Sequence, residues 1–263
     1  MRTYLLNSFR LIVWISLISL VFASCIPQKK MLYMQVEKGA DSLVDFKNEK
    51  KIEYLIQPGD NLYIRVVTPD EKSTFLLNPL SSGGNTNISN DASVYLNSYS
   101  VTEAGMLDFP MVGKISVKNL NVEQITKKIE TSLDPLLINF VVIVKLVNFN
   151  ITMLGEVKNP GQYKIYQDNI NIFEAVSMAS DLTDFANRHK VALIRQTKSG
   201  SEVVYIDMTD QTLLLSEYYY LRPNDILYVQ PLKGKQFTFA NFPYGVVFGF
   251  VSSTILLLSY LNL

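Results

Sequence analysis

The sequence predicts an α+β protein made of two small β-rich modules, flanked by apolar segments at the two ends of the chain. Three observations support this fold class. Short β-branched runs recur through the middle, two stretches combine helical spacing with capping residues, and long uncharged runs stand at both ends. At 263 residues the chain can hold one or two modest domains.

Composition narrows the classes of function. The chain has 24 basic and 24 acidic residues, so it lacks the basic excess of a nucleic-acid-binding protein. One cysteine and one histidine exclude a disulfide framework and a Cys/His zinc cluster. We find no phosphate-binding loop, nucleophile elbow or zinc-protease motif. The sequence therefore predicts no catalytic residue, no metal and no cofactor.

Residues 1–24 predict a secretory signal peptide. The segment has two arginines and no acid, and 11–23 is an uncharged apolar run. Thirteen helical residues span about 20 Å, which is too short for a comfortable membrane crossing. A small residue precedes Cys25 at the expected cleavage point. Residues 25–50 then predict a polar tether. The alternative for Cys25 is an ordinary buried thiol near the end of an uncleaved anchor.

The first module is expected over 51–150. A Pro58-Gly59 turn separates two β-rich runs in 54–67, and the Asn/Ser/Gly-rich stretch 78–92 predicts a loop. Residues 98–117 predict three strands separated by turns.

The clearest helix follows this run of strands. Asn121 and Gln124 form a capping box in front of apolar residues that share one helical face. The β-branched stretch 139–155 predicts one long strand or two consecutive strands.

The second module is expected over 151–232. A hairpin turning at Asn159, Pro160 and Gly161 opens it, and a short helix with its own capping box follows. Residues 190–208 predict a second hairpin, and the last strands come before 232.

A Pro-x-Asp pattern occurs once in each module. "QPGDNLYI" at 57–64 returns as "RPNDILYV" at 222–229. Asp60 and Asp225 could act as a general acid/base pair only if the fold brought them within a few ångströms. Proline instead fixes φ for a turn, and an aspartate two residues later can accept turn N–H groups. We therefore predict structural turns at the residues Pro58, Gly59, Asp60, Pro223 and Asp225. The single His189 is predicted to be a solvated loop residue.

Residues 240–263 predict a transmembrane helix, because no charge follows Lys235 and about 30 Å of helix is available. Small residues form a stripe on this helix, which favours association with copies of itself. The stripe comprises Gly245, Gly249, Ser252, Ser253 and Ser259. The alternative is a plain monomeric tail anchor.

The order of these motifs resembles the bacterial outer-membrane polysaccharide export family (the Wza type). "YLIQPGDNLYIRV" resembles the start of the export domain, and Gly105, Leu107, Pro110 and Gly113 resemble its hairpin motif. "LGEVKNPGQY" resembles the start of an SLBB domain, a small β-grasp-like module. One SLBB module fits, and the family's usual Ala-Gly-Gly after its helix appears as "ASD" at 179–181.

The resemblance implies a transport role rather than an enzyme. "VFASC" resembles a bacterial lipobox, which would make Cys25 the lipid attachment site of an outer-membrane lipoprotein, with most of the chain in the periplasm. Family members assemble into rings, octameric in the well-studied type. Capsular polysaccharide or exopolysaccharide leaves through the ring, which docks on an inner-membrane polysaccharide co-polymerase. The alternative is a membrane-held SLBB protein that binds glycan or a partner and forms no pore.

Overall fold

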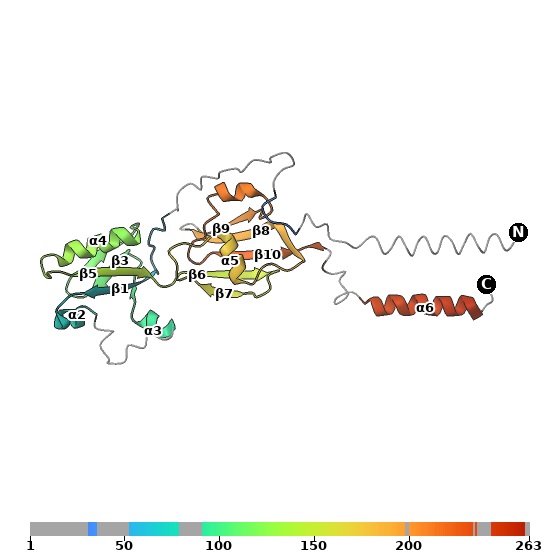
Figure 1. Ribbon diagram of the computed structural model, residues 1–263, viewed down its shortest axis with the longest axis horizontal. Coiled ribbons are helices and arrows are strands. Elements are labelled where there is room, and N and C mark those ends of the chain that lie inside the picture. Colours follow the sequence, from blue (N-terminus) through green and yellow to red (C-terminus); the bar gives the residue numbers. More distant parts are fainter. Residues whose placement is uncertain are drawn as a thin grey trace.

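A computed structural model of the protein describes residues 31–35, 53–78, 91–197, 200–233, 235 and 243–260. The described elements form two mixed units of strands and helices that lie next to each other in the chain path, followed by a separate helix (Figure 1). The predicted combination of small β-rich modules with a few helices is confirmed. The signal peptide, Cys25 and most of the tether lie outside the described residues.

The first unit is built on a three-stranded sheet. Its central strand β1 (Asn61–Val67) pairs antiparallel with β2 (Tyr99–Ser100) on one side and β5 (Val141–Leu146) on the other. A separate hairpin is formed by β3 (Met106–Phe109) and β4 (Gly113–Ser116).

Helix α4 (Val122–Leu133) packs on this unit and has the predicted capping box. The Asn121 side chain accepts from the Gln124 N–H, and the Gln124 side chain accepts from the Asn121 N–H. Ile125, Ile129 and Leu133 are fully buried in the core of the unit. The three side chains recur every four residues, so one face of the helix supplies the apolar surface that holds it to the sheet.

Two short helices in this unit were not predicted: α2 (Glu71–Leu77) and α3 (Asp91–Leu96). Asp70 caps α2 by accepting the Ser73 N–H at 2.9 Å. At its other end, the Asn78 side chain accepts from the Val66 N–H at 3.0 Å and donates to the Val66 carbonyl at 2.7 Å. Tertiary pairing with β1 therefore fixes a helix that is too short to be stable by itself.

The second unit has a five-stranded sheet in the order β7-β6-β10-β8-β9. Only the β6–β10 pair is parallel. The elements are β6 (Asn150–Gly155), β7 (Gly161–Lys164), α5 (Ile172–Met178), β8 (Ala186–Thr197), β9 (Gly200–Ile206), the 3-10 helix η3 (Gln211–Leu215) and β10 (Ile226–Pro231). Both predicted hairpins, β6–β7 and β8–β9, are present, as is the capping box of α5.

Residues 31–35 form a strap on the second unit, although the first unit follows them in the chain. The Met34 N–H donates to the Met208 carbonyl at 3.2 Å, and the Gln35 N–H donates to the Thr209 carbonyl at 2.5 Å. The second unit is thus completed by a segment that precedes the first unit. The tether prediction contained no such contact.

The C-terminal helix α6 spans Tyr244–Tyr260, which is shorter than the predicted 240–263. It begins directly after Pro243, whose carbonyl accepts the Val246 N–H at 3.0 Å. Its 17 residues correspond to about 26 Å. None of the helices in the described ranges has the combined length and apolarity of a membrane span, so the predicted transmembrane helix is not found there.

Candidate functional site

The first Pro-x-Asp sequence forms a tight turn that leads into β1. The Asp60 N–H donates to the Gln57 carbonyl at 3.1 Å, and Gly59 has φ +89°. A positive φ at the third position is the mark of a type II turn, with Pro58 at the position before it. The Asp60 carboxylate is buried and accepts the Gln57 N–H at 2.8 Å and the Tyr54 hydroxyl at 3.0 Å.

The second Pro-x-Asp sequence forms the same turn ahead of β10. The Asp225 N–H donates to the Arg222 carbonyl at 3.2 Å, and Asn224 takes the positive φ, at +66°. The Asp225 carboxylate accepts the Arg222 N–H at 2.7 Å, as Asp60 does from Gln57. The two turns therefore share three features. Each has a proline at the second position and a positive φ at the third, and in each the aspartate carboxylate accepts the N–H of the first residue.

The second turn has a partner that the first turn lacks. Arg195 on β8 binds Asp225 through both carboxylate oxygens, with Nε at 3.0 Å from Oδ1 and an Nη at 2.7 Å from Oδ2. The two side chains are 5% and 1% exposed. This is a bidentate buried ion pair, the geometry in which arginine holds a carboxylate most specifically. This ion pair was not predicted from the sequence.

Electrostatics at the first turn are governed by burial. Burial raises the pKa of Asp60, and the hydrogen bonds from Gln57 and Tyr54 only partly oppose that effect. Burial and the neighbouring Asp60 also raise the pKa of the Tyr54 hydroxyl, which is further influenced by the charges of Arg222 and Asp225. The two turns therefore lie within electrostatic range of each other, but each carboxylate is occupied by its own partners. The pair does not present a shared acid/base site to a substrate.

Each turn also fixes the strand beside it. The Val101 N–H donates to the Asp60 carbonyl at 2.8 Å, and the Thr152 N–H donates to the Asp225 carbonyl at 2.9 Å. The Asn148 side chain accepts the Asn61 N–H at 3.0 Å, just before β6 begins. The connection between the two units thus runs alongside the first turn.

Of the remaining predicted turn residues, Pro160 lies in the connection from β6 to β7, whereas Gly161 is the first residue of β7, opposite Met153. A nearby glycine carries the stronger constraint. Gly155 has φ +87°, and a Cβ there would lie 2.1 Å from the Val229 carbonyl oxygen on β10. Close approach of two backbones therefore requires glycine at this position.

The strap covers a buried cation on the second unit. The Tyr33 hydroxyl donates to Asp181 at 2.6 Å, and the Arg188 guanidinium lies 5.1 Å from the centre of the Tyr33 ring. Burial and the Asp181 hydrogen bond raise the pKa of Tyr33 to about 12. Arg188 is 4% exposed, and its Nε and one Nη have no hydrogen-bond partner in the described part of the chain. Cation–π contact with the strap thus stabilises a charge that is otherwise poorly compensated.

His189 lies on β8 and not in a loop, which corrects the prediction. Its Nδ1 is 3.1 Å from Asp207 and 2.9 Å from the Thr209 hydroxyl. Burial opposes ionisation of Asp207, but hydrogen bonds from Thr209 and His189 lower the pKa of Asp207 overall. Because both partners share one ring nitrogen, the cluster does not have the nucleophile–histidine–acid order of a catalytic triad.

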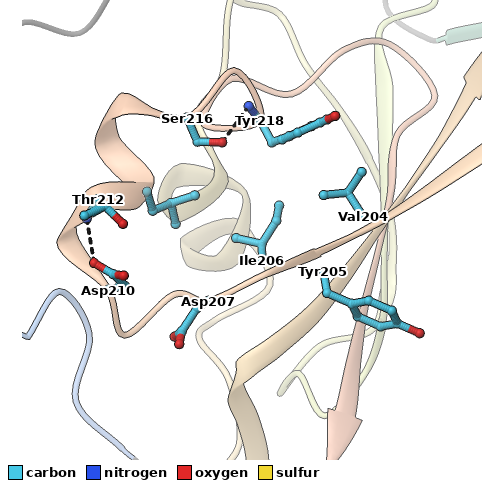
Figure 2. A pocket seen from close by; sticks show the side chains of 9 residues that line it. Val204, Tyr205, Ile206, Asp207, Asp210, Thr212, Ser216 and Tyr218 are labelled. Atoms are coloured by element: carbon cyan, nitrogen blue, oxygen red, sulfur yellow. Dashed lines mark hydrogen bonds between the residues drawn. The ribbon is translucent and has the colours of Figure 1, made fainter.

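A pocket of about 180 Å³ lies between β9 and η3 (Figure 2). Val204 and Ile206 point into it, whereas Tyr205 and Asp207 point to the other side of the strand. The polar groups at its rim are already occupied by local turns. Asp210 accepts the Thr212 N–H at 2.8 Å, and Ser216 accepts the Tyr218 N–H at 3.1 Å. The pocket therefore has an apolar floor and no nucleophile–base pair.

No cluster of histidine, cysteine and acidic side chains that could hold a metal occurs in the described ranges. The small-residue stripe lies on α6, where an added Cβ at Gly245 or Gly249 would meet no atom within 4 Å. Val246, Phe250 and Leu256 of α6 are highly exposed.

Two family matches follow the division into two units. Residues 48–147 match the family described as polysaccharide biosynthesis/export protein, and residues 150–229 match the SLBB domain. The boundary falls at the Asn148 connection between the units. The chain therefore belongs to the polysaccharide export protein family and carries one SLBB domain.

Proposed function

We propose that this protein is an outer-membrane lipoprotein whose copies assemble into a channel for capsular polysaccharide or exopolysaccharide, and that it is not an enzyme. The observation that supports this most strongly is the pair of matched domains in export order. The internal hydrogen bonding of both Pro-x-Asp carboxylates supports the second half of the proposal. Its expected partners are the polysaccharide, membrane lipid and an inner-membrane co-polymerase.

Both ends of the folded region leave from the second unit. Tyr33 of the strap is eight residues after Cys25, which allows about 28 Å of extended chain. At the other end, Lys235 pairs with the buried Glu156 shortly before α6. Burial would raise the pKa of Glu156, but the bonds from Lys235 and Thr183 lower it. If Cys25 is lipidated, the second unit lies close to the outer membrane and the first unit extends into the periplasm.

Helix α6 supplies the surface for self-association. Residues 245–256, 259 and 260 are exposed, and nothing described packs on Gly245 or Gly249. The Ser253 hydroxyl donates to the Gly249 carbonyl at 2.9 Å, so this polar group has its hydrogen bond within the helix. Small residues on one face allow helices to approach closely, so α6 is suited to pack against α6 of other copies.

Deletion of the protein in its source bacterium tests the function. Surface polysaccharide should be lost, polymer should accumulate inside the envelope, and a plasmid-borne wild-type chain should restore export. Unchanged surface polysaccharide in the deletion strain would refute the proposal. A strain that exports normally but has lost binding of a soluble partner would favour the membrane-held binding protein instead.

The anchor is tested separately. Labelled palmitate should enter the wild-type chain and should not enter Cys25→Ser. Equal labelling of both chains would show that Cys25 is not the lipidated residue.

A further inference from the structure

The strap is fastened to the second unit at the segment 180–183, which lies between α5 and β8. The Tyr33 hydroxyl donates to the Asp181 carboxylate at 2.6 Å, and the same carboxylate oxygen accepts the Leu182 N–H at 2.7 Å. Among the described residues, the strap is the part closest in sequence to Cys25. The contact at Asp181 therefore holds the end of the folded region that leads to the proposed lipid anchor.

The same segment also holds the chain that leads to α6. Its Thr183 hydroxyl donates to the Glu156 carboxylate at 2.8 Å. That carboxylate belongs to a side chain only 8% exposed, and it forms an ion pair with Lys235. Close by in the chain, the Leu232 N–H donates to the Phe185 carbonyl at 2.7 Å. The connection from β10 to α6 is thus fixed beside the point where the strap is fixed.

Backbone strain is concentrated in this shared segment. Ser180 and Asp181, with φ +60° and +77°, are the one pair of neighbouring non-glycine residues with positive φ in the described part of the chain. The Asp181 N–H and carbonyl are held by Val176 and Lys158, each at 3.0 Å. A strained conformation persists only while its surroundings enforce it. The Tyr33 bond is the side-chain contact that depends on the strap, so its loss favours relaxation of the segment.

The docked strap is opposed by the charge that it covers. Arg188 is 4% exposed beneath the Tyr33 ring, and its Nε and one Nη have no hydrogen-bond partner among the described residues. Buried donors without partners cost free energy that they recover when water reaches them. The ring offsets part of this cost through its cation–π contact. The strap therefore has a docked state and a competing released state in which Arg188 is hydrated.

We infer that the segment 180–183 couples the strap to the connection before α6, so that release of either one loosens the other. In the docked state Asp181 holds Tyr33, while Thr183 orients Glu156 toward Lys235. In the released state the segment relaxes and Thr183 no longer fixes the Glu156 carboxylate. A two-state element that is biased from both sides is the physical basis of such coupling.

The use of this coupling rests on the proposed function, although the coupling itself does not. If Cys25 is lipidated and α6 associates with other copies, seating of the anchored strap would fix the direction in which α6 leaves the second unit. Coupling between two sites is reciprocal, so assembly through α6 would also favour the docked strap.

Hydrogen exchange of the full-length chain in detergent, read by mass spectrometry, tests the inference. Peptides containing 31–35 and 230–235 report on the two ends. A peptide containing 192–196, in the middle of β8, reports global opening of the second unit. Tyr33→Phe removes the hydroxyl that reaches Asp181 and keeps the aromatic ring.

The matched control is Tyr218→Phe. It removes another tyrosine–carboxylate bond of the second unit, to Glu202 at 3.1 Å, which takes no part in the contacts of the segment 180–183. The reciprocal variant is Lys235→Met, which removes the ion pair with Glu156 from the other end.

Tyr33→Phe should accelerate exchange of both end peptides at least about threefold, as expected for one lost hydrogen bond, and should leave 192–196 unchanged. Lys235→Met should likewise accelerate 31–35, and Tyr218→Phe should change neither end. The double variant should show less than the product of the single effects, because both substitutions loosen one segment. With Asp181→Gly as the starting chain, adding Tyr33→Phe should have no further effect on 230–235.

Several results would overturn the inference. Acceleration of 31–35 alone by Tyr33→Phe, or of 230–235 alone by Lys235→Met, would show that the two ends are held independently. Equal acceleration of 192–196, or the same pattern in Tyr218→Phe, would show general destabilisation in place of coupling. The proposed function would stand in all of these cases. Conversely, unchanged surface polysaccharide in the deletion strain would refute that function and leave the coupling intact.

Discussion

The two Pro-x-Asp turns share a backbone and differ in charge compensation. In the first unit Asp60 is paired with neutral donors, the Gln57 N–H and the Tyr54 hydroxyl. In the second unit Asp225 is paired with the buried Arg195 guanidinium. The comparison separates two roles of the aspartate. Closing the turn is common to both sites, whereas balancing a buried cation belongs only to the second.

The largest effect is expected for Asp225→Asn. The substitution leaves Arg195 buried without a counter-charge, which should lower the free energy of unfolding of the second unit by about 3–5 kcal/mol. Denaturant unfolding measures this loss. Adding Arg195→Met removes the orphaned charge, so the double variant should be more stable than Asp225→Asn alone. If the double variant were less stable than Asp225→Asn alone, the unpaired Arg195 charge would not be the cause of the stability loss.

A smaller effect is expected for Asp60→Asn. Asparagine keeps one acceptor oxygen for the turn, and no buried cation loses its partner. The free energy of unfolding of the first unit should fall by about 1–2 kcal/mol at neutral pH. Equal losses at the two sites, measured in the same denaturant, would refute the distinction between the turns.

The pH dependence should have opposite signs at two acids. The folded pKa of Asp60 is raised, so its contribution to stability declines as pH rises through that pKa. The folded pKa of Glu156 is lowered, so its contribution is present above its unfolded value of about 4.3 and is lost as pH falls through the folded pKa. As pH rises from 3 to 6.5, the stability of wild type should fall relative to that of Asp60→Asn. Over the same range it should rise relative to that of Glu156→Gln. Unfolding free energies at both pH values provide the measurement, and parallel trends would contradict it.

The smallest effects concern the third residue of each turn. Gly59→Ala puts a Cβ at φ +89° and should cost about 1–2 kcal/mol, although no atom lies within 4 Å of that Cβ. Asn224→Gly relaxes the same conformation and should change stability by less than about 0.5 kcal/mol. Thermal melts of the two variants distinguish backbone strain from packing. A stability loss for Gly59→Ala well above the expected range would require a steric clash and would contradict the strain explanation.

Local signals were sufficient for much of the fold. The capping boxes at Asn121 and Asn171, the β-rich hairpins and the order of the two units all depend on residues close in sequence. Helix α2 could not be predicted, because its end is fixed by pairing of Asn78 with β1. The strap could not be predicted either, because its hydrogen bond joins Met34 to Met208, two residues that are far apart in the sequence.

The Arg195–Asp225 pair has a partial signal in the sequence. Arg195 shares the two-residue period of Val191 and Leu193, so alternation places it on the buried face of β8. A buried arginine requires an acid, and Asp225 was already expected in a turn. Periodicity can therefore indicate which face of β8 carries Arg195, but only the fold identifies Asp225 as its partner.

The departure at 179–181 has a structural counterpart. Ser180 and Asp181 have φ +60° and +77°, the region where glycine is easiest, so non-glycine residues there carry backbone strain. Asp181 in turn accepts the Tyr33 hydroxyl and the Leu182 N–H, which offsets part of that cost. The sequence difference therefore gives the second unit a side-chain contact with the strap that glycine could not make.

Export by cells that carry Asp60→Asn tests the central claim, that the Pro-x-Asp residues are architectural in this polysaccharide export protein. Protein abundance and oligomer mass are recorded in the same cells. We predict surface polysaccharide near the wild-type level once the variant chain is folded and assembled. A folded, assembled and abundant Asp60→Asn chain that exports no polysaccharide would contradict the account and assign a chemical role to this acid.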